Sequence, residues 1–152
     1  MSITKPETVA DGPPFIGALL RMTQQRVRAR MQDAAREAGF TDLQDAHWAM
    51  ITYPAPDGVR PSELARRARI SRQAANHLIA QLEILGYFER RSAEGGSRRL
   101  VHLTPRGRHL CEAVFACLRE IHVEWAAEVG ADRFAVMLDV LRVLSRPEDP
   151  TR

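Results

Sequence analysis

The chain has 152 residues, of which 45% are hydrophobic and 27% charged, and this composition is typical of one soluble globular domain. No apolar run has the length of a signal peptide or a membrane-spanning helix, so we expect a cytoplasmic protein without a membrane partner. The net charge is only +3, but residues 60–108 contain 11 Arg against 4 Glu. Such a concentration of positive charge is typical of a surface that faces phosphate groups.

The N-terminal part of the chain is predicted to be an arm followed by a long helix. Residues 1–12 are polar and contain Pro and Gly, which indicates a flexible arm. Pro13 and Pro14 suit the start of a helix that would end at Gly39. A helix of this length is longer than a small core can cover, so a second copy of the chain is expected to bury part of its apolar stripe. That stripe consists of Ile16, Leu20, Thr23, Val27, Met31, Ala34 and Ala38.

A second helix is predicted after the sequence TDLQ at residues 41–44, which matches a capping box. Its end is indicated by Pro54, Pro56 and Gly58. The side chains expected to point partly inward are those of Leu43, Trp48, Met50 and Ile51.

The next segment, residues 61–86, has the pattern of two short helices joined by a tight turn. Pro61 suits the first turn of one helix, Ser71 is a good N-cap for the next, and Gly86 would end it. An apolar stripe on the second helix is predicted at Ala74, Leu78, Leu82 and Leu85. The opposite face carries groups that can hydrogen-bond to base edges or phosphates, although they are also common on an ordinary solvated helix. These candidate DNA-binding residues are Ser71, Arg72, Gln73, Ala75, Asn76 and His77.

A β-hairpin is predicted directly after this helix and favours the DNA-binding interpretation. Residues 87–90 and 100–103 have the composition of short strands, and the turn between them contains Gly95 and Gly96. Thr104 and Pro105 then suit the N-cap and the first turn of another helix. The arginines expected to contact phosphates are Arg90, Arg91, Arg98 and Arg99.

Two amphipathic helices are predicted at the C-terminal end. The first would run from Pro105 to Gly130, and the second would be capped by Asp132 and end before Pro147. The apolar stripe of the second helix is predicted at Phe134, Met137, Leu138, Leu141 and Leu144.

The run LARRARISRQAANHLIAQLEILGYFERR, the hairpin and the sequence LVHLTPRG together resemble the winged helix-turn-helix of the MarR family of bacterial transcriptional regulators. By motif the resemblance covers roughly residues 58–108. It implies a mainly α fold with a small β-hairpin wing, in which residues 41–104 form the DNA-binding lobe and residues 13–38 and 105–146 form the dimerisation region. The family wing usually carries Asp and Arg close together near its tip, whereas residues 94–98 here read EGGSR.

The function implied by the resemblance is that of a homodimeric regulator, a repressor that binds a pseudo-palindromic operator in double-stranded DNA. In the family, small aromatic or phenolic anions often bind between the dimer helices and the winged lobe. The candidate residues for such an effector pocket are Arg21, His47, Trp48 and Tyr53.

Two alternatives remain open at this stage. The altered wing tip is also consistent with a winged-helix protein-interaction module without specific DNA binding. The second alternative is a cysteine-based, redox-responsive regulator. Cys111 and Cys117 stand about 240° apart on one predicted helix, however, and cannot pair with each other.

Neither a catalytic centre nor a metal site is predicted. The sequence contains no GxSxG, GxxxxGK[ST] or GxGxxG motif, and its five histidines show no HxxxH or HExxH spacing. We therefore expect a protein that is not an enzyme and binds no cofactor or metal.

Overall fold

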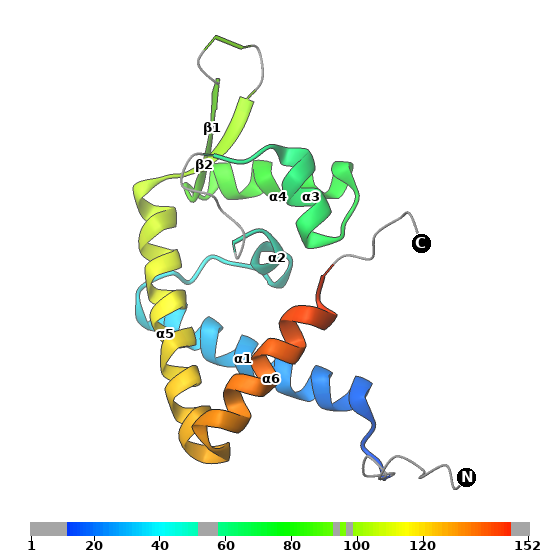
Figure 1. The fold of residues 1–152 in the computed structure, drawn as a ribbon. Coiled ribbons are helices and arrows are strands. Elements are labelled where there is room, and N and C mark those ends of the chain that lie inside the picture. Colours follow the sequence, from blue (N-terminus) through cyan, green and yellow to red (C-terminus); the bar gives the residue numbers. More distant parts are fainter. Residues whose placement is uncertain (1–11, 52–57, 93–94, 97–98, 147–152) are drawn as a thin grey trace, which may run out of the picture.

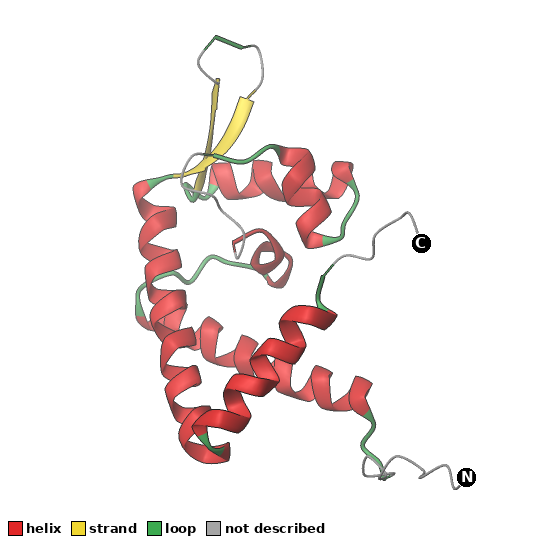
Figure 2. Ribbon diagram, viewed as in Figure 1, coloured by secondary structure: helices red, strands yellow, loops and turns green. Residues whose placement is uncertain are grey.

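The computed structural model describes residues 12–51, 58–92, 95–96 and 99–146 (Figure 1). Within these ranges the chain is mainly helical with one antiparallel hairpin, as predicted (Figure 2). Its elements are α1 (Ile16–Glu37), the 3-10 helix η1 (Asp45–His47), α2 (Trp48–Ile51), α3 (Pro61–Ala68), α4 (Arg72–Ile84), β1 (Phe88–Ser92), β2 (Arg99–Leu103), α5 (Pro105–Val129) and α6 (Ala131–Leu144).

Helix α5 connects the two ends of the molecule (Figure 1). At one end it follows the hairpin and adjoins the lobe of α2, α3 and α4, and at the other end it packs against α1 and α6. An ion pair between Arg30 and Glu124, with an N–O distance of 2.8 Å, joins α1 to α5. The hairpin extends beyond α3 and α4 at the far end of the lobe.

The hairpin begins one residue later than the sequence predicts. Phe88 pairs with Leu103 and Arg90 with Val101, whereas Tyr87 precedes the strand and is fully buried. Val59 forms an isolated antiparallel bridge with Val101, through backbone hydrogen bonds of 3.0 and 2.8 Å. The chain just before α3 therefore holds the base of the hairpin.

The helix starts agree only partly with the predictions. The side chain of Ser71 accepts a hydrogen bond from the backbone N–H of Ala74, and Thr104 accepts one from Gly107, so both predicted N-caps are confirmed. The predicted capping box at residues 41–44 is wrong, because η1 begins only at Asp45. The cap assigned to Asp132 is also wrong, because Gly130 already turns the chain with a φ of 95° and α6 starts directly after it.

The core lies in the lobe and extends along the C-terminal half of α1 and the N-terminal half of α5. Helix α4 is rotated from its predicted orientation, because Ala75 and Ile79 are fully buried while Ala74 is exposed. The largest fully buried side chains are Met50, Ile51, Leu64, Ile79, Leu82, Tyr87, Leu110 and Val114.

Large apolar side chains remain exposed on the N-terminal half of α1 and on α6. Of the predicted α1 stripe, Met31 is buried, but Ile16 and Leu20 are exposed to 67% and 48%. On α6 Phe134 is buried, whereas most of the predicted stripe faces outward. The exposed set comprises Phe15, Ile16, Leu19, Leu20 and Met22 near the start of α1, and Val136, Met137, Val140, Leu141, Val143 and Leu144 on α6. None of the helices in the described ranges is long and apolar enough to cross a membrane.

Gly107 provides a stability test, because α5 passes so close to Tyr87 that a Cβ at this position would lie 2.2 Å from the Tyr87 carbonyl oxygen. We expect Gly107→Ala to lower the free energy of unfolding by about 1–3 kcal/mol through overpacking. Urea unfolding followed by circular dichroism, at one fixed protein concentration, measures this loss. Gly17→Ala is the matched control, because a Cβ there meets nothing within 4 Å and alanine favours helix. An equal loss in both variants would contradict the close approach.

Candidate nucleic-acid interface

Helix α4 exposes a polar face on the outside of the lobe. Arg72, Gln73, Asn76 and His77 are all exposed, and the Ser71 cap fixes the first turn of the helix beneath them. The candidate Ala75 is wrong, because it is fully buried and its methyl group cannot reach a base. The rotation of α4 places these side chains together within its first two turns, where a recognition helix contacts base edges.

The hairpin arginines do not share one environment. Arg90 is partly covered and pairs with Glu83 of α4 at an N–O distance of 3.3 Å. Arg91 pairs with Glu89 on the same strand and remains more than half exposed. Arg99 is exposed at the start of β2, and Arg98 lies outside the described residues. Arg90 therefore fastens the hairpin to α4, while Arg91 and Arg99 are open to solvent.

Helix α3, which a short turn connects to α4, carries further arginines. Hydrogen bonds from Arg66 and then Arg67 lower the pKa of Glu63 to about 2, so this carboxylate is ionised at neutral pH. Arg69 ends α3 in a left-handed conformation with a φ of 55°, which makes the turn toward α4 tight. The positive charge predicted for residues 60–108 is thus partly neutralised by acidic partners within the lobe.

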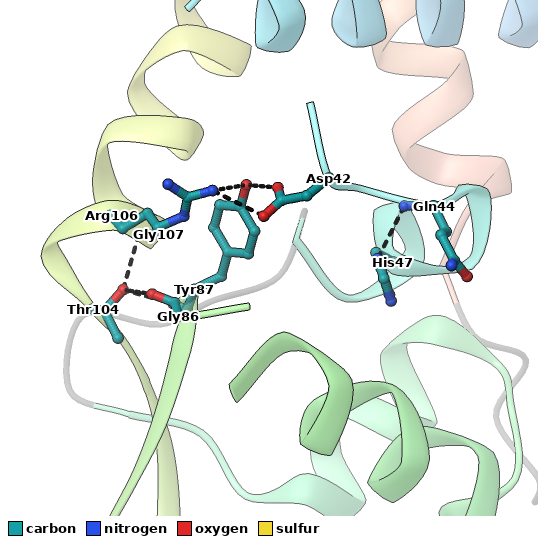
Figure 3. A network of polar contacts seen from close by, with 8 residues as sticks. All are labelled: Asp42, Gln44, His47, Gly86, Tyr87, Thr104, Arg106 and Gly107. Carbon is teal, nitrogen blue, oxygen red and sulfur yellow. Dashed lines mark hydrogen bonds and ion pairs between the residues drawn. The ribbon is translucent and has the colours of Figure 1, made fainter. Parts of the chain in front are cut away.

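A polar network connects the α1–η1 loop, the base of the hairpin and the first turn of α5 (Figure 3). The hydroxyl of Tyr87 donates to the Asp42 carboxylate, and Arg106 Nη2 lies 3.0 Å from both Asp42 Oδ2 and the Tyr87 hydroxyl oxygen. The Arg106 guanidinium also lies over the rings of Tyr87 and Phe40, at 4.7 and 5.5 Å from their centroids. Sequence reasoning missed this network, because the TPRG motif indicates only the start of a helix.

The network changes the pKa of two of its members. Burial and the hydrogen bond to Asp42 raise the pKa of Tyr87 to about 12. Burial alone would raise the pKa of Asp42, but the hydrogen bond from Tyr87 and the nearby Arg106 guanidinium bring it below its ordinary value. At neutral pH the network therefore consists of a phenol, a carboxylate and a guanidinium.

An open cavity of about 990 Å³ lies between α1, η1, α2, the end of α3 and the end of α6. Trp48, one of the candidate effector residues, contributes to its lining, and so does Arg28. Two other candidates lie away from this cavity: Arg21 does not line it, and the buried His47 ring is hydrogen-bonded to Gln44 and Gln81. Tyr53 lies outside the described residues. The lining residues are Gln24, Val27, Arg28, Met31, Asp45, Ala46, Trp48, Ala49, Arg67, Ala68, Arg69, Leu144 and Ser145.

Both cysteines are buried thiols on α5. Burial raises the pKa of Cys111 to about 11 and also raises the pKa of Cys117. The Cys111 thiol donates to the carbonyl oxygen of Ile51 over 3.7 Å. Since the thiolate is the reactive form, this environment disfavours a redox role. No group of three or more His, Cys, Asp or Glu side chains in the described part of the chain is arranged to hold a metal ion.

Solved structures share this arrangement. The NadR complex with 4-hydroxyphenylacetate is 20% identical, covers 97% of this chain and 100% of its own, and has a TM-score of 0.68. A MarR-family transcriptional regulator from Rhodococcus sp. RHA1 is 20% identical, covers 85% and 91%, and has a TM-score of 0.66. The chain has the MarR-type winged-helix fold.

A third structure with the MarR-type fold is a MarR family protein of Mycobacterium tuberculosis in complex with salicylic acid. It is 27% identical, covers 90% of this chain and 100% of its own, and has a TM-score of 0.59. No protein-family model matches the sequence, and no curated protein matches it. The predicted resemblance is confirmed at the level of fold, with α4 as the second helix of the helix-turn-helix and β1–β2 as the wing.

The Asp42 network generates a prediction with a defined pH dependence. Asp42→Asn removes the carboxylate and is expected to lower the free energy of unfolding by about 1 kcal/mol at neutral pH. Because the folded-state pKa of Asp42 lies below its ordinary value of 3.8, its contribution is complete above that pH and is lost as the pH falls further. The difference between parent and variant should therefore shrink in acid, as measured by urea unfolding at several pH values.

Asp33→Asn serves as the control for Asp42→Asn, since Asp33 is exposed and pairs only with Arg36 one turn away among the residues described. Its effect on unfolding should be smaller than that of Asp42→Asn. A loss for Asp42→Asn that stays constant down to the lowest pH would contradict the assignment.

Proposed function

We propose that this chain is a DNA-binding transcriptional regulator of the MarR type, a homodimeric repressor that acts in the cytoplasm on a pseudo-palindromic operator. The observation that carries the proposal is the exposed polar face of α4 next to an arginine-bearing wing. In a winged helix-turn-helix, such a helix lies in the major groove and the wing lies beside it.

Base readout is assigned to Arg72, Gln73, Asn76 and His77, whose side chains carry suitable donors and acceptors. Ser71 and the backbone amides at the start of α4 are assigned to a phosphate. The phosphate contacts of the wing are assigned to Arg91, Arg98 and Arg99, and Arg90 is assigned to holding the wing on α4 through Glu83.

The exposed apolar faces of α1 and α6 support a homodimer. Contiguous apolar patches of this kind are uncommon on monomers and mark interaction sites. A two-fold dimer would also present two copies of α4 about 34 Å apart, as successive major grooves require. We therefore assign the dimer contacts to the exposed apolar side chains within residues 13–38 and 105–146, and the DNA-binding lobe to residues 41–104.

The cavity next to Trp48 is proposed as the effector site. NadR is solved with 4-hydroxyphenylacetate and the mycobacterial protein with salicylic acid, which are both aromatic carboxylates. In this chain the cavity combines an aromatic ring and aliphatic side chains with the guanidinium groups of Arg28 and Arg69. Arg28 Nη2 already donates to the carbonyl oxygen of Asp45 over 2.6 Å, whereas Arg69 is exposed and makes no ion pair with any residue described. We assign the carboxylate of the effector to Arg69.

The DNA proposal is tested by binding of the purified chain to its own promoter region and to a scrambled duplex at several salt concentrations. Selective binding, two protomers per site and a steep salt slope are expected. Arg99→Ala should weaken binding to both duplexes alike and reduce the salt slope by about 1, because it removes one phosphate contact. Fluorescence anisotropy measures both quantities.

Arg142→Ala is the matched control for Arg99→Ala, because it removes the same charge from α6, where Arg142 pairs with Asp139. It should leave the salt slope unchanged. Equal and weak binding of the parent to both duplexes would overturn the proposed function and favour the protein-interaction module.

The effector proposal is tested by tryptophan fluorescence. The chain has two tryptophans, so Trp125→Phe leaves Trp48 in the cavity as the single reporter. Titration with salicylate or 4-hydroxyphenylacetate should change its emission. Arg69→Gln in this background should weaken binding about tenfold, as expected when a charged hydrogen bond is lost.

Arg66→Gln is the control in the fluorescence titration, because Arg66 lies on the same helix and does not line the cavity. Its titration curve should match that of the Trp125→Phe parent. Equal weakening by both arginine variants would contradict the assignment of Arg69.

A further inference from the structure

A chain of hydrogen bonds runs from the backbone before η1 to the exposed face of α4. The backbone N–H of Gln44 donates to His47 Nδ1 over 3.0 Å, a contact visible in Figure 3. His47 Nε2 lies 2.9 Å from Gln81 Oε1, and Gln81 Nε2 lies 3.0 Å from His77 Nε2. His47 is 2% exposed, Gln81 is half-buried and His77 is exposed, so the chain of bonds leads outward from the core.

The backbone N–H of Gln44 sets the direction of every hydrogen bond in this series. A backbone N–H can only donate, so His47 Nδ1 must be the acceptor and the proton of the neutral ring must sit on Nε2. That Nε2–H needs an acceptor, which the oxygen of the Gln81 amide supplies. The amide nitrogen of Gln81 then faces His77 and donates, so His77 Nε2 must be unprotonated.

The reversed orientation of the Gln81 amide is excluded by the same argument. It would place an NH₂ group against His47 Nε2, and His47 would then need to accept at both ring nitrogens. A neutral imidazole has one N–H and one acceptor, so such a ring does not exist. Because His47 is buried, an unpaired donor there would also cost free energy without compensation from water.

We propose that this relay holds His77 as the Nδ1–H tautomer and that His77 uses this N–H as a hydrogen-bond donor to read a base in the major groove. The proposal rests on the proposed function and adds a specificity-determining group to it. His47 and Gln81 are positioning residues, because they act on the base only through His77. In the described part of the chain His77 Nδ1 meets no acceptor, which leaves this donor free for a ligand.

A fixed donor discriminates among bases in a predictable way. In the major groove guanine offers an acceptor at N7 or O6, adenine at N7 and thymine at O4. Cytosine offers only the donors of its N4 amino group. His77 should therefore exclude cytosine from the contacted strand at one position of each half-site. The Nε2–H tautomer, which prevails in a free neutral histidine side chain, would offer an acceptor at Nδ1 and admit cytosine.

The relay is tested first without DNA, by long-range ¹H–¹⁵N correlation spectra of the full-length protein at neutral pH. His47 is expected to carry its proton on Nε2 and His77 on Nδ1, and a His77→Ala spectrum assigns the latter signals. His109 is the internal reference, because it is exposed and should show the ordinary mixture of tautomers. Protonation of His77 on Nε2, or averaging like that of His109, would overturn the proposal.

A nearly isosteric variant tests whether Gln81 imposes the tautomer. The carboxylate of Gln81→Glu can only accept, so both neighbouring rings must present a proton to it, and His77 should become protonated on Nε2. The signals of His109 should stay unchanged. An unchanged His77 spectrum in this variant would overturn the relay.

The reading role is tested by selecting binding sites from a pool of random duplexes. The parent should exclude cytosine at one position per half-site, and His77→Ala should reduce this discrimination by about fivefold, as for one lost hydrogen bond. Gln81→Met, once its fold is confirmed by circular dichroism, should relax the same position although His77 is intact. A merely structural role of Gln81 would weaken binding without changing the base preference.

The outcomes separate the two proposals. Strong selection with an unchanged base preference in His77→Ala would overturn the reading role and leave the proposed function standing. A parent protein that selects no sequence would overturn the proposed function and the reading role together, whatever tautomer the spectra show. His109→Ala controls for the loss of an imidazole and should select the same sites as the parent.

Discussion

The close contact between Tyr87 and the first turn of α5 is the constraint on which the geometry of the lobe depends. The carbonyl oxygen of Tyr87 accepts a hydrogen bond from the backbone N–H of Thr104 at 3.1 Å, and Gly107 leaves room for it because it has no Cβ. The Tyr87 side chain meanwhile reaches Asp42 and Arg106. One residue thus fixes the end of α4, the base of the wing and the start of α5 relative to one another.

This constraint has a consequence for the proposed dimer. Asp42, in the loop after α1, and Arg106, in the first turn of α5, are the two charged members of the same network (Figure 3). The ion pair thus connects the loop after α1 to the first turn of α5, and the rings of Phe40 and Tyr87 lie against the Arg106 guanidinium. A connection of this kind would suit the proposed dimer, in which the two copies of α4 need a defined separation.

Much of the fold could be predicted from the sequence, because the residues that begin and end its helices act locally. Ser71, Thr104 and Gly130 act within one helical turn, so the starts of α4 and α5 and the end of α5 follow from residue type alone. The rotation of α4 could not be predicted, because Ala74 and Ala75 are equally apolar and only packing against the core decides between them. The same holds for Arg90, whose partner Glu83 lies on a different element.

The orientation of the His47 ring is a further feature that the spacing of apolar residues cannot predict. His47 was a reasonable candidate for a pocket by its neighbours, and Ala46 and Trp48 on either side do line the cavity. Its ring points the other way, because the Gln44 N–H captures Nδ1 and turns Nε2 toward Gln81. The short segment of η1 and α2 therefore has two faces, one on the cavity and one on the hydrogen-bond chain to α4. A ligand in the cavity would contact this segment directly, whereas a base at His77 would be connected to it only through the Gln81 amide and the His47 ring.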